Sequence, residues 1–393
     1  MNIIEVKTKR EKKEFIDFPK WLYRDDNDYV SPLDSGIEAI FDPERNHAFS
    51  HGKAIRWILS DETGKTIGRV AAFVDRIRSD ANNQPTGGLG FFEVIENSDA
   101  AFRLFDTAKE WLSSQGIEAM DGPINFGEND NNWGLLVDGF VQQAYGMPYN
   151  KKYYREYFEE YGFRNYFEQY SYHVPVDKFP ERIMKIADWI SRRPGYTFRH
   201  FELKNSGKYV NDIVEVYNSA WSVFKEDFTP LEPAILEESL KKAEFIIDEE
   251  LIWFAYFNDK PIAFFILFPD VNQILKHLNG KLHLWNMIKV LYYKLTHEMT
   301  RMRALVGGVH PNYQNSGVES AIFLQLYRVF VRKPWYKELE LSWVGDFNPK
   351  MISIYEALGS RRAKVHVTYR YMINTARKFV RYSDEMAAKQ KTT

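Results

Sequence analysis

The chain repeats one arrangement of strands, and this repeat limits the possible folds more than any other feature of the sequence. Residues 55–75 read IRWILSDETGKTIGRVAAFVD, and residues 251–270 read LIWFAYFNDKPIAFFILFPD. Each stretch contains an apolar strand, a short polar turn and a second apolar strand that ends in Asp. When Lys65 is aligned with Lys260, both second strands end at the same position. We therefore expect two copies of one structural unit.

The elements after these hairpins also follow the same order in both halves. In the second half, a strand at 303–309 leads into a helix at 317–331, whose apolar residues recur at helical spacing. The first half has its counterpart at 89–112, and a strand, a tyrosine-rich helix and a final strand close each half. A chain of 393 residues also exceeds one ordinary core. We expect domains at 1–177 and 178–393, although many α/β chains share this rhythm.

Composition excludes several kinds of site and partner. Cysteine is absent, which excludes disulfides, thiolate catalysis and cysteine-based zinc sites. The formal net charge is −2, so we expect no nucleic acid and no membrane as partners. The N-terminal residues lack the apolar segment of a signal peptide, and the longest apolar run, 262–268, is too short to cross a bilayer. We therefore expect a cytoplasmic protein; the sequence does not indicate its oligomeric state.

Two stretches that resemble metal-binding motifs lack required positions. The alternating polar residues at 128–132 are followed by Trp133, where a calcium loop needs glycine. Residues 297–301 read HEMTR, so the second histidine of the HExxH zinc motif is replaced by arginine. The other histidines do not pair at metal-ligand spacing. We expect no metal.

A glycine-led loop at the start of the second-half helix is the strongest candidate for a binding site. Residues 307–323 read GGVHPNYQNSGVESAIF, with Gly317 three residues after Gln314. A glycine turn before a helix presents unpaired N–H groups and the positive end of the helix dipole, a combination that binds phosphates. The same residues also suit an ordinary turn that starts a helix. The loop alone does not decide between these two interpretations.

The context of the loop resembles a known family. Residues 314–319, QNSGVE, follow a strand and are similar to the [Q/R]-x-x-G-x-[G/A] signature of the GCN5-related N-acetyltransferases (GNAT). After the next strand, Asn348 precedes Tyr355 by seven residues, a spacing that the family also shows. The resemblance covers residues 200–374, and looser features elsewhere resemble bacterial tandem members of the superfamily. It implies an α/β (α+β) protein of two tandem GNAT-like domains, each a mixed, mostly antiparallel sheet flanked by helices.

The resemblance also implies acyl-CoA-dependent N-acyltransfer, with acetyl-CoA or another acyl-CoA as co-substrate and a small-molecule amine or amino-acid-like acceptor that attacks directly. Backbone N–H groups of Gly308 and Val309 would polarise the thioester carbonyl. The residues that would hold the diphosphate are Gln314, Asn315, Ser316, Gly317, Val318 and Ser320. Asn348 would contact the pantetheine arm, and Tyr355 would protonate the departing thiolate. Core packing is the alternative role for Tyr355.

One position departs from the family signature and keeps other functions open. Glu319 stands where the family has Gly or Ala. A carboxylate suits the first turn of a helix but repels a diphosphate. Either Glu319 points to solvent, or the loop binds the cofactor weakly or differently. A non-catalytic binding module is therefore one alternative. An aminoacyl transferase of the peptidoglycan-bridge type is another, although the sequence lacks the basic groove that such enzymes usually need.

The first half lacks the glycine-led loop. Its matching residues, 96–100, read ENSDA, with two carboxylates where phosphates would lie. We expect Ser98 or Asp99 to cap the following helix and this half to bind no cofactor.

Four residues are candidates for the acceptor pocket. Asn125 and Asn129 belong to a polar loop of the first half, and loops on a rigid scaffold often carry binding residues. Trp221 and Asp227 lie in the segment that borders the acceptor site in the superfamily. The alternatives are a solvated loop and a surface pair.

Overall fold

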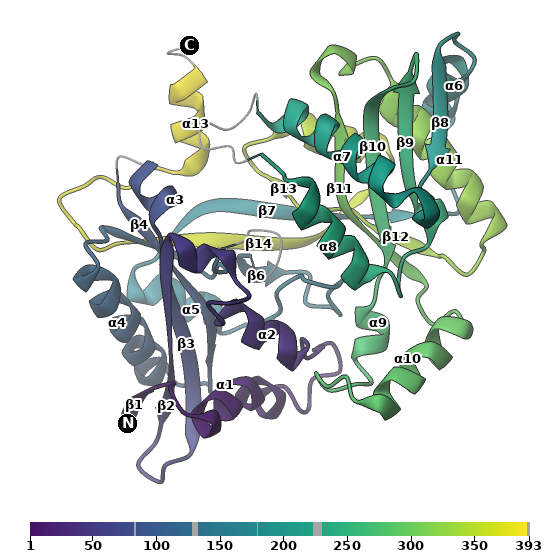
Figure 1. Cartoon of the computed structure of the whole chain (residues 1–393). Coiled ribbons are helices and arrows are strands. Elements are labelled where there is room, and N and C mark those ends of the chain that lie inside the picture. The colour runs from purple at the N-terminus through teal and green to yellow at the C-terminus, as the bar shows by residue number, and fades with distance from the viewer. Residues whose placement is uncertain (82–83, 128–132, 179, 223–229, 391–393) are drawn as a thin grey trace.

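One continuous sheet of fourteen strands passes through both halves of the computed structural model (Figure 1). The structure describes residues 1–393 except 82–83, 128–132, 179, 223–229 and 391–393. The strand order is β1-β2-β3-β4-β5-β14-β7-β12-β11-β10-β9-β8, with β6 paired to β14 and β13 paired to β7. Neighbours are antiparallel except for β4–β5 and β11–β12, which are parallel. The expected mixed, mostly antiparallel sheet is confirmed.

The first half supplies the strands at one end of the sheet and a compact apolar core around helix α4. Its elements are β1 (Asn2–Glu5), α1 (Lys9–Leu22), α2 (Asp34–Ile40), β2 (Gly52–Ser60), β3 (Thr66–Asp75), α3 (Arg76–Ala81), β4 (Thr86–Val94), α4 (Ser98–Ser114), β5 (Ala119–Gly122), β6 (Leu135–Asp138), α5 (Tyr154–Tyr161) and β7 (Arg164–Pro175). The cap of α4 differs from the expected Ser98 or Asp99. The Asn97 side chain accepts a hydrogen bond from the Ala100 backbone N–H at 2.8 Å, because Asn97 is the last residue with extended backbone.

The second half repeats this order and adds helices. Its elements are α6 (Glu181–Ser191), β8 (Tyr196–His200), α7 (Ser206–Trp221), α8 (Pro233–Ala243), β9 (Ile252–Phe257), β10 (Lys260–Pro269), α9 (Asn272–Leu275), α10 (Leu284–Leu295), β11 (Arg301–Val309), α11 (Val318–Arg332), β12 (Glu338–Glu340), β13 (Val344–Gly345), α12 (Pro349–Ala357), β14 (Arg361–Met372) and α13 (Tyr382–Gln390). The repeated hairpins are therefore β2–β3 and β9–β10.

The two halves exchange their final strands. The last strand of the second half, β14, pairs with β5 of the first half, whereas β7 of the first half pairs with β12 of the second. The two exchanged strands also pair with each other, from Arg361 opposite His173 to Arg370 opposite Arg164. Each sheet is thus completed by the other half of the chain. The boundary between residues 177 and 178 stays a prediction.

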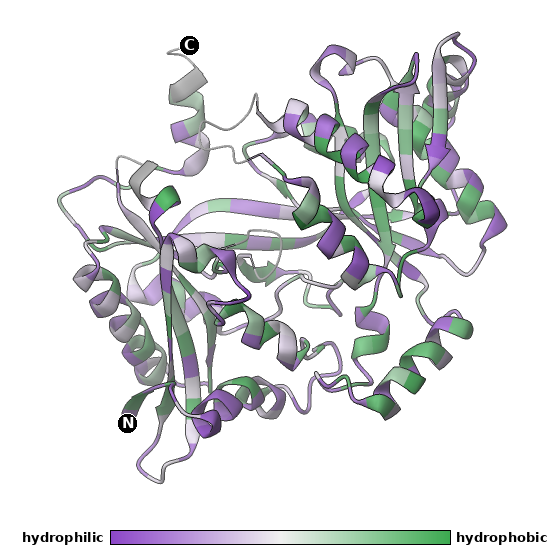
Figure 2. Ribbon diagram, in the orientation of Figure 1, coloured by the Kyte–Doolittle hydropathy of each residue, from purple (hydrophilic) through white to green (hydrophobic). Residues whose placement is uncertain are grey.

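Helices cover both faces of the second-half sheet, because its strands are apolar on both sides. Phe254 of β9 and Phe264 of β10 pack against α7 and α8. The alternate residues Trp253 and Ala255 face the opposite side, where α11 packs against the sheet and α6 packs against α11. Figure 2 shows the corresponding apolar stripes along these strands and helices. The α7–α8 side and the α6–α11 side are therefore separate faces of one sheet.

A buried charge network holds the two halves together where β11 begins. The Arg301 guanidinium lies 2.6 Å from the Asp270 carboxylate and also donates to the backbone carbonyls of residues 142–143, each at 3.1 Å. Lys364 of β14 pairs with Glu340 of β12 in the same layer. Arg301, Glu340 and Lys364 come from neighbouring regions of the sheet but from different parts of the chain. Because these groups are buried, removal of one would leave its partner as an unpaired charge in the interior.

Candidate active site

Strands β11 and β12 separate after a short paired stretch, and the separation makes an opening in the second-half sheet. Only Arg301–Arg303 pair with Glu338–Glu340. Beyond this point the Ser342 hydroxyl donates to the carbonyls of Ala304, at 2.6 Å, and Leu305, at 2.8 Å. The chain after β12 then pairs with β7 through β13. The end of β11 therefore keeps β10 as its neighbour but has no ladder to β12.

The hydrogen-bond alternation of β11 decides which backbone N–H groups face this opening. The His310 N–H donates to the Ile262 carbonyl on β10 at 2.8 Å, and Gly308 lies opposite Phe264. Because antiparallel partners alternate, the Gly308 N–H belongs to the β10 ladder. The N–H groups of Gly307 and Val309 then point toward the opening. The geometry favours this pair over Gly308 and Val309, the pair expected from the sequence.

The loop before α11 has the backbone of a tight turn. Gly317 is the N-cap of α11 with a φ of 87°, a left-handed conformation that favours glycine. A Cβ at this position would lie 2.8 Å from the Ile186 side chain of α6. Gly317 is therefore needed for both the turn and the packing of α6.

Several groups at this helix start already have partners within the loop. The Ser320 N–H donates to the Gly317 carbonyl at 3.0 Å, and the Ser316 N–H donates to the Tyr313 carbonyl at 3.2 Å. The Val318 N–H reaches the Ser316 hydroxyl at 3.4 Å. Asn315 adopts a positive φ of 64°, so Gln314 and Asn315 lead into the turn. The geometry accommodates a helix start, and phosphate binding by the loop stays a prediction.

Glu319 lies at the first turn of α11 and is half-buried. Burial raises the pKa of its carboxyl group, and the opposing effects are a hydrogen bond from its own N–H and the charge of Lys350. Its carboxylate therefore occupies part of the positive helix end that a diphosphate would use. Lys350 belongs to α12, so this pair also brings the loop close to the helix that begins after Asn348.

Asn348 and Tyr355 lie at opposite ends of α12. The Asn348 side chain caps α12 by accepting from the Met351 N–H at 3.2 Å. The Tyr355 side chain is buried in the core, where its ring packs edge-on against Tyr172 at a centroid distance of 5.4 Å. Burial raises the pKa of its phenol well above the usual range. Their roles toward a cofactor stay predictions; the observed contacts are a helix cap and core packing.

Trp221 lies directly beside the opening, on the α7–α8 side of the sheet. A Cβ at Gly308 would be 3.0 Å from the Trp221 ring and 3.0 Å from the Phe264 ring. Tyr217 stacks on Trp221 with centroids 4.5 Å apart. The three rings give this side of the opening an apolar edge.

The remaining acceptor candidates do not extend this edge. Asn125 is buried in the first half, where its oxygen accepts from the Phe126 N–H at 3.0 Å. Its neighbours Ile124 and Phe126 pack with Phe73, away from β11. Asn129 and Asp227 lie outside the described residues.

The first half reaches the opening through a tryptophan that is not among the candidates predicted from the sequence. Trp133 is buried, and its ring centroid lies 5.5 Å from that of Trp343, the residue after Ser342. Trp133 also contacts His366 of β14 at 4.7 Å. The wall of the opening therefore includes residues from both halves. The signal in the sequence was a tryptophan within a polar loop.

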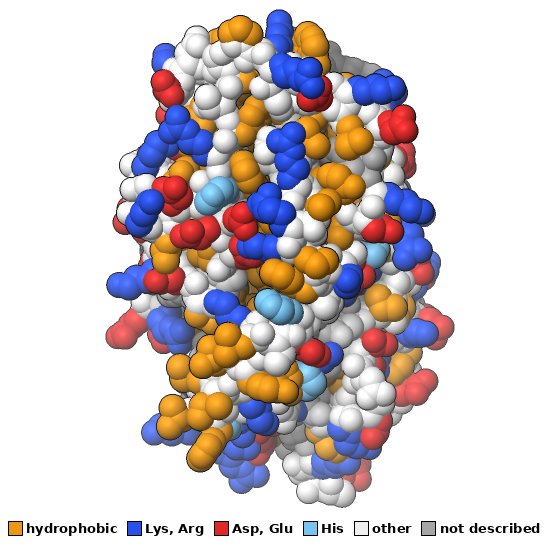
Figure 3. Space-filling model, turned by 90° about the vertical axis from the view of Figure 1, so that its right-hand side faces the viewer, with side chains coloured by type: hydrophobic (Ala, Val, Ile, Leu, Met, Phe, Trp, Pro, Cys, Tyr) orange, Lys and Arg blue, Asp and Glu red, His pale blue; other side chains and the backbone are white. Residues whose placement is uncertain are grey.

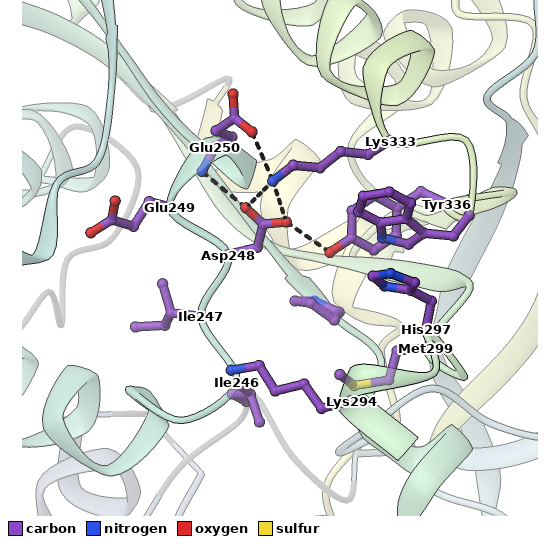
Figure 4. Close-up of a pocket in the computed structure, with 12 residues that line it drawn as sticks. Ile246, Ile247, Asp248, Glu249, Glu250, Lys294, His297, Met299, Lys333 and Tyr336 are labelled. Carbon is purple, nitrogen blue, oxygen red and sulfur yellow. Dashed lines mark hydrogen bonds and ion pairs between the residues drawn. The ribbon is translucent and has the colours of Figure 1, made fainter. Parts of the chain in front are cut away.

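A separate hollow of about 390 Å³ lies at the other end of α11 (Figure 4). The Lys333 ammonium lies 2.6 Å from Asp248 and 2.8 Å from Glu250, and the Tyr336 hydroxyl donates to Asp248 at 2.9 Å. These contacts pair the charged groups with one another. Because α11 has fifteen residues, the hollow is roughly 20 Å from Gly317 and does not form part of the opening.

The described part of the chain has neither a cluster of metal-ligand side chains nor a membrane-spanning helix. Residues 1–393 without the gaps given above contain no group of three or more His, Asp or Glu side chains that could hold a metal ion. Within the same residues, no helix combines the length and the hydropathy needed to cross a bilayer.

Two known proteins match nearly the whole chain, and no protein-family model matches it. Protein YghO of Escherichia coli (strain K12) is 26% identical over 378 residues, which cover 93% of this chain and 94% of that protein. A protein of Caulobacter vibrioides named bacterial ceramide synthase is 28% identical over 382 residues, which cover 94% of this chain and 97% of that protein.

Among solved structures, a tandem GNAT protein from the clavulanic acid biosynthesis pathway aligns with 95% of this chain and 98% of its own, with a TM-score of 0.56. The chain has the tandem GNAT fold. Sequence identity to that structure is 10%, so the likeness shows the fold alone. The tandem GNAT fold confirms the architecture implied by residues 314–319 and by the spacing of Asn348 and Tyr355.

Proposed function

We propose that the chain is an acyl-CoA-dependent N-acyltransferase whose second half holds the thioester. The opening between β11 and β12, beside the glycine-led start of α11, is the observation that carries this proposal. The tandem GNAT fold supports it. The first half is proposed to bind no acyl-CoA, because the corresponding helix α4 begins with an Asn97 side-chain cap and no glycine turn.

In the proposed reaction, the lone pair of the acceptor amine attacks the thioester carbon, so a C–N bond forms and the C–S bond breaks. The N–H groups of Gly307 and Val309 would stabilise the negative charge that develops on the carbonyl oxygen. The amine attacks the thioester directly, so no covalent bond to the protein forms. The amine loses one proton to solvent. Tyr355 is the proposed proton donor to the departing thiolate, and it then regains a proton from solvent. Its raised pKa keeps it protonated at neutral pH but makes it a weak acid toward a thiolate.

The proposed acceptor class is supported by the surroundings of the opening and by one relative. Trp221 and Phe264 give the opening an apolar edge on the α7–α8 side. A relative matched along 94% of this chain is named a bacterial ceramide synthase, and a ceramide is the amide of a long-chain amino alcohol. We propose a long-chain amino alcohol as acceptor and a long-chain acyl-CoA as donor. Acetyl transfer to a small amine, which the sequence favoured, is the other outcome of an acceptor screen.

Calorimetric titration with acetyl-CoA and with a long-chain acyl-CoA tests the site itself. Gly317→Asp forces a side chain into a left-handed position against Ile186 and adds a negative charge, so binding should weaken by at least about tenfold. Glu319→Ala removes a competing carboxylate, so binding should tighten by about threefold or more. The matched control is Gly207→Asp at the start of α7, where a Cβ meets nothing within 4 Å. Equal weakening by both aspartates would contradict the proposal.

A non-catalytic binding module is the second candidate, and the position of Glu319 favours it. Its carboxylate lies at the helix end that a diphosphate needs. Folded protein that shows no heat with either acyl-CoA up to about millimolar concentration, and no gain in Glu319→Ala, would support this candidate and exclude the transferase.

A further inference from the structure

Helix α10 presents a broad apolar face to solvent. It belongs to the segment between β10 and β11, and seven of its apolar side chains are between 53% and 73% exposed. They are Leu284, Trp285, Met287, Ile288, Leu291, Tyr292 and Leu295. Isolated exposed apolar residues are ordinary, but a continuous face of this kind marks an interaction site. Figure 2 shows α10 as a largely apolar helix at the lower edge of the molecule, and Figure 3 shows hydrophobic side chains gathered low on the side that carries it.

The opposite face of α10 is fixed to the protein, so the exposed face is held in a defined orientation. The Asn286 side chain is buried and donates to the Lys281 carbonyl at 2.7 Å. Val290 and Tyr293 pack on the small core formed around α9, and Tyr293 stacks on His277 at 4.6 Å. The helix is therefore anchored by a narrow stripe and shows its wider apolar side to the surroundings.

The segment that carries this face is positively charged. Residues 271–297 contain Lys276, Lys281, Lys289 and Lys294 but no Asp or Glu, and all four lysines are exposed. The whole chain has a formal net charge of −2, so this excess is local. Lysines beside an exposed aromatic and aliphatic face are the pattern of a helix that lies in the interface of an anionic bilayer. Tryptophan and tyrosine suit the headgroup level of such an interface.

We propose that α10 docks the protein on the surface of an anionic lipid bilayer, with the helix parallel to the membrane plane and its apolar face among the upper acyl chains. This inference rests on the proposed function, because docking would bring the enzyme to a long-chain amine that resides in the membrane. Helix α10 lies below the α7–α8 face, and the Lys294 ammonium donates to the carbonyl of Phe245, shortly after α8, at 2.6 Å (Figure 1). The docked surface is thus continuous with the acceptor side of the sheet.

Charge argues for a bilayer over a second copy of the chain. In a two-fold dimer through α10, the same patch would face itself. The lysines of the two copies would then approach one another, and residues 271–297 offer no carboxylate to pair with them. Lysine and anionic phosphate groups are complementary, and each lysine near such a surface strengthens binding by about fivefold.

Vesicle co-sedimentation of the full chain tests the proposal. The probes are vesicles of equal parts phosphatidylglycerol and phosphatidylcholine, and vesicles of phosphatidylcholine alone. We expect binding to the anionic vesicles that weakens by at least about tenfold between low and half-molar salt. The triple variant Trp285→Ser, Ile288→Ser, Leu291→Ser should lose at least about tenfold in affinity.

The matched control replaces a tryptophan and two aliphatic residues of similar exposure elsewhere. Trp189→Ser, Ile77→Ser and Val331→Ser remove side chains that are 57%, 54% and 64% exposed, against 73%, 53% and 57% for the α10 set. An equal loss in both triple variants, no binding by the wild type, or a dimer that only the α10 variant dissociates would overturn the proposal.

Activity in detergent micelles separates this inference from the proposed function. Turnover of a long-chain amine in micelles without binding to vesicles would refute membrane docking alone. Binding to vesicles without transfer to any amine would refute the transferase alone.

Discussion

The buried histidine of β14 gives the sharpest prediction about stability. His366 is fully buried between the Trp133 ring and the Pro148 carbonyl, which lies 3.2 Å from its Nε2 atom. Its Nδ1 atom has no hydrogen-bond partner among the described residues. Burial lowers its pKa to about 3, and the charge of Lys364 acts in the same direction. The folded protein therefore keeps His366 neutral under mildly acidic conditions.

The sign of the pH effect follows from proton binding. An unfolded histidine has a pKa of about 6.5, so below that value the unfolded chain takes up a proton that the folded chain does not. Stability then falls with decreasing pH, from about 6.5 down to about 3, by about 1.4 kcal/mol per pH unit. Between about pH 8 and about pH 5, His366 alone should lower the free energy of unfolding by about 2 kcal/mol. Above about pH 7 it should have no effect.

Urea unfolding of the wild type and of His366→Gln measures this contribution. Glutamine does not titrate, and its amide N–H can replace the donor to Pro148. Between the two pH values, the free energy of unfolding should fall by about 2 kcal/mol less in the variant than in the wild type. This difference does not depend on the stability of the variant at the higher pH. All other titrating groups are common to both proteins and cancel in this difference. Equal losses in the two proteins would refute the reasoning.

Three further predictions concern the charge network and the opening. Arg301→Met leaves Asp270 buried without its cation, so it should lower the free energy of unfolding, measured by heat or urea, by about 3 kcal/mol. The double variant Arg301→Met, Asp270→Leu should recover most of the lost stability. Unchanged stability of the single variant would contradict a role for the pair. Trp221→Ala should raise KM for the acceptor several-fold, by about 1 kcal/mol of lost contact, and leave the Kd for acyl-CoA unchanged; the reverse pattern would place Trp221 at the cofactor. Tyr355→Phe keeps the packing on Tyr172 and removes only the hydroxyl, so kcat should fall by about 10²-fold if that group donates the proton. A fall below about twofold would assign Tyr355 to packing alone.

Local patterns in the sequence were enough to predict most elements of the fold. The hairpin of residues 251–270 appears as β9 and β10, and the helix expected at 317–331 appears as α11 at Val318–Arg332. These elements follow from apolar residues spaced about every 2 or every 3.6 positions, and from turn residues that lie next to them in the sequence. The exchange of β7 and β14 has no such signal. Their sequences favour strands, but the choice between pairing within a half and pairing across halves depends on contacts that are distant in the sequence.

The position of the candidate site in the chain could be predicted from the sequence, but the groups that face the opening were harder to predict. The glycine at 317 is fixed by a local requirement for positive φ, so a sequence signature can reveal it. Which N–H groups of β11 face the opening depends on the register with β10, which the sequence does not state. Trp133 and Ser342 reach the opening through long-range packing and a side-chain hydrogen bond at the separating strands. The exposed face of α10 was missed because the net charge of −2 hides a local excess of lysine.

The exchanged strands also affect how the chain can fold while it is being synthesised. While the chain is being synthesised, the edge of β5 has no partner until β14, which ends at Met372, has left the ribosome. An unpaired edge of this kind readily pairs with another chain. A fragment that stops near residue 177 would therefore tend to associate with a second copy, each donating its last strand to the other. Two identical units that trade their final strands, once joined end to end in one gene, would give the arrangement seen here.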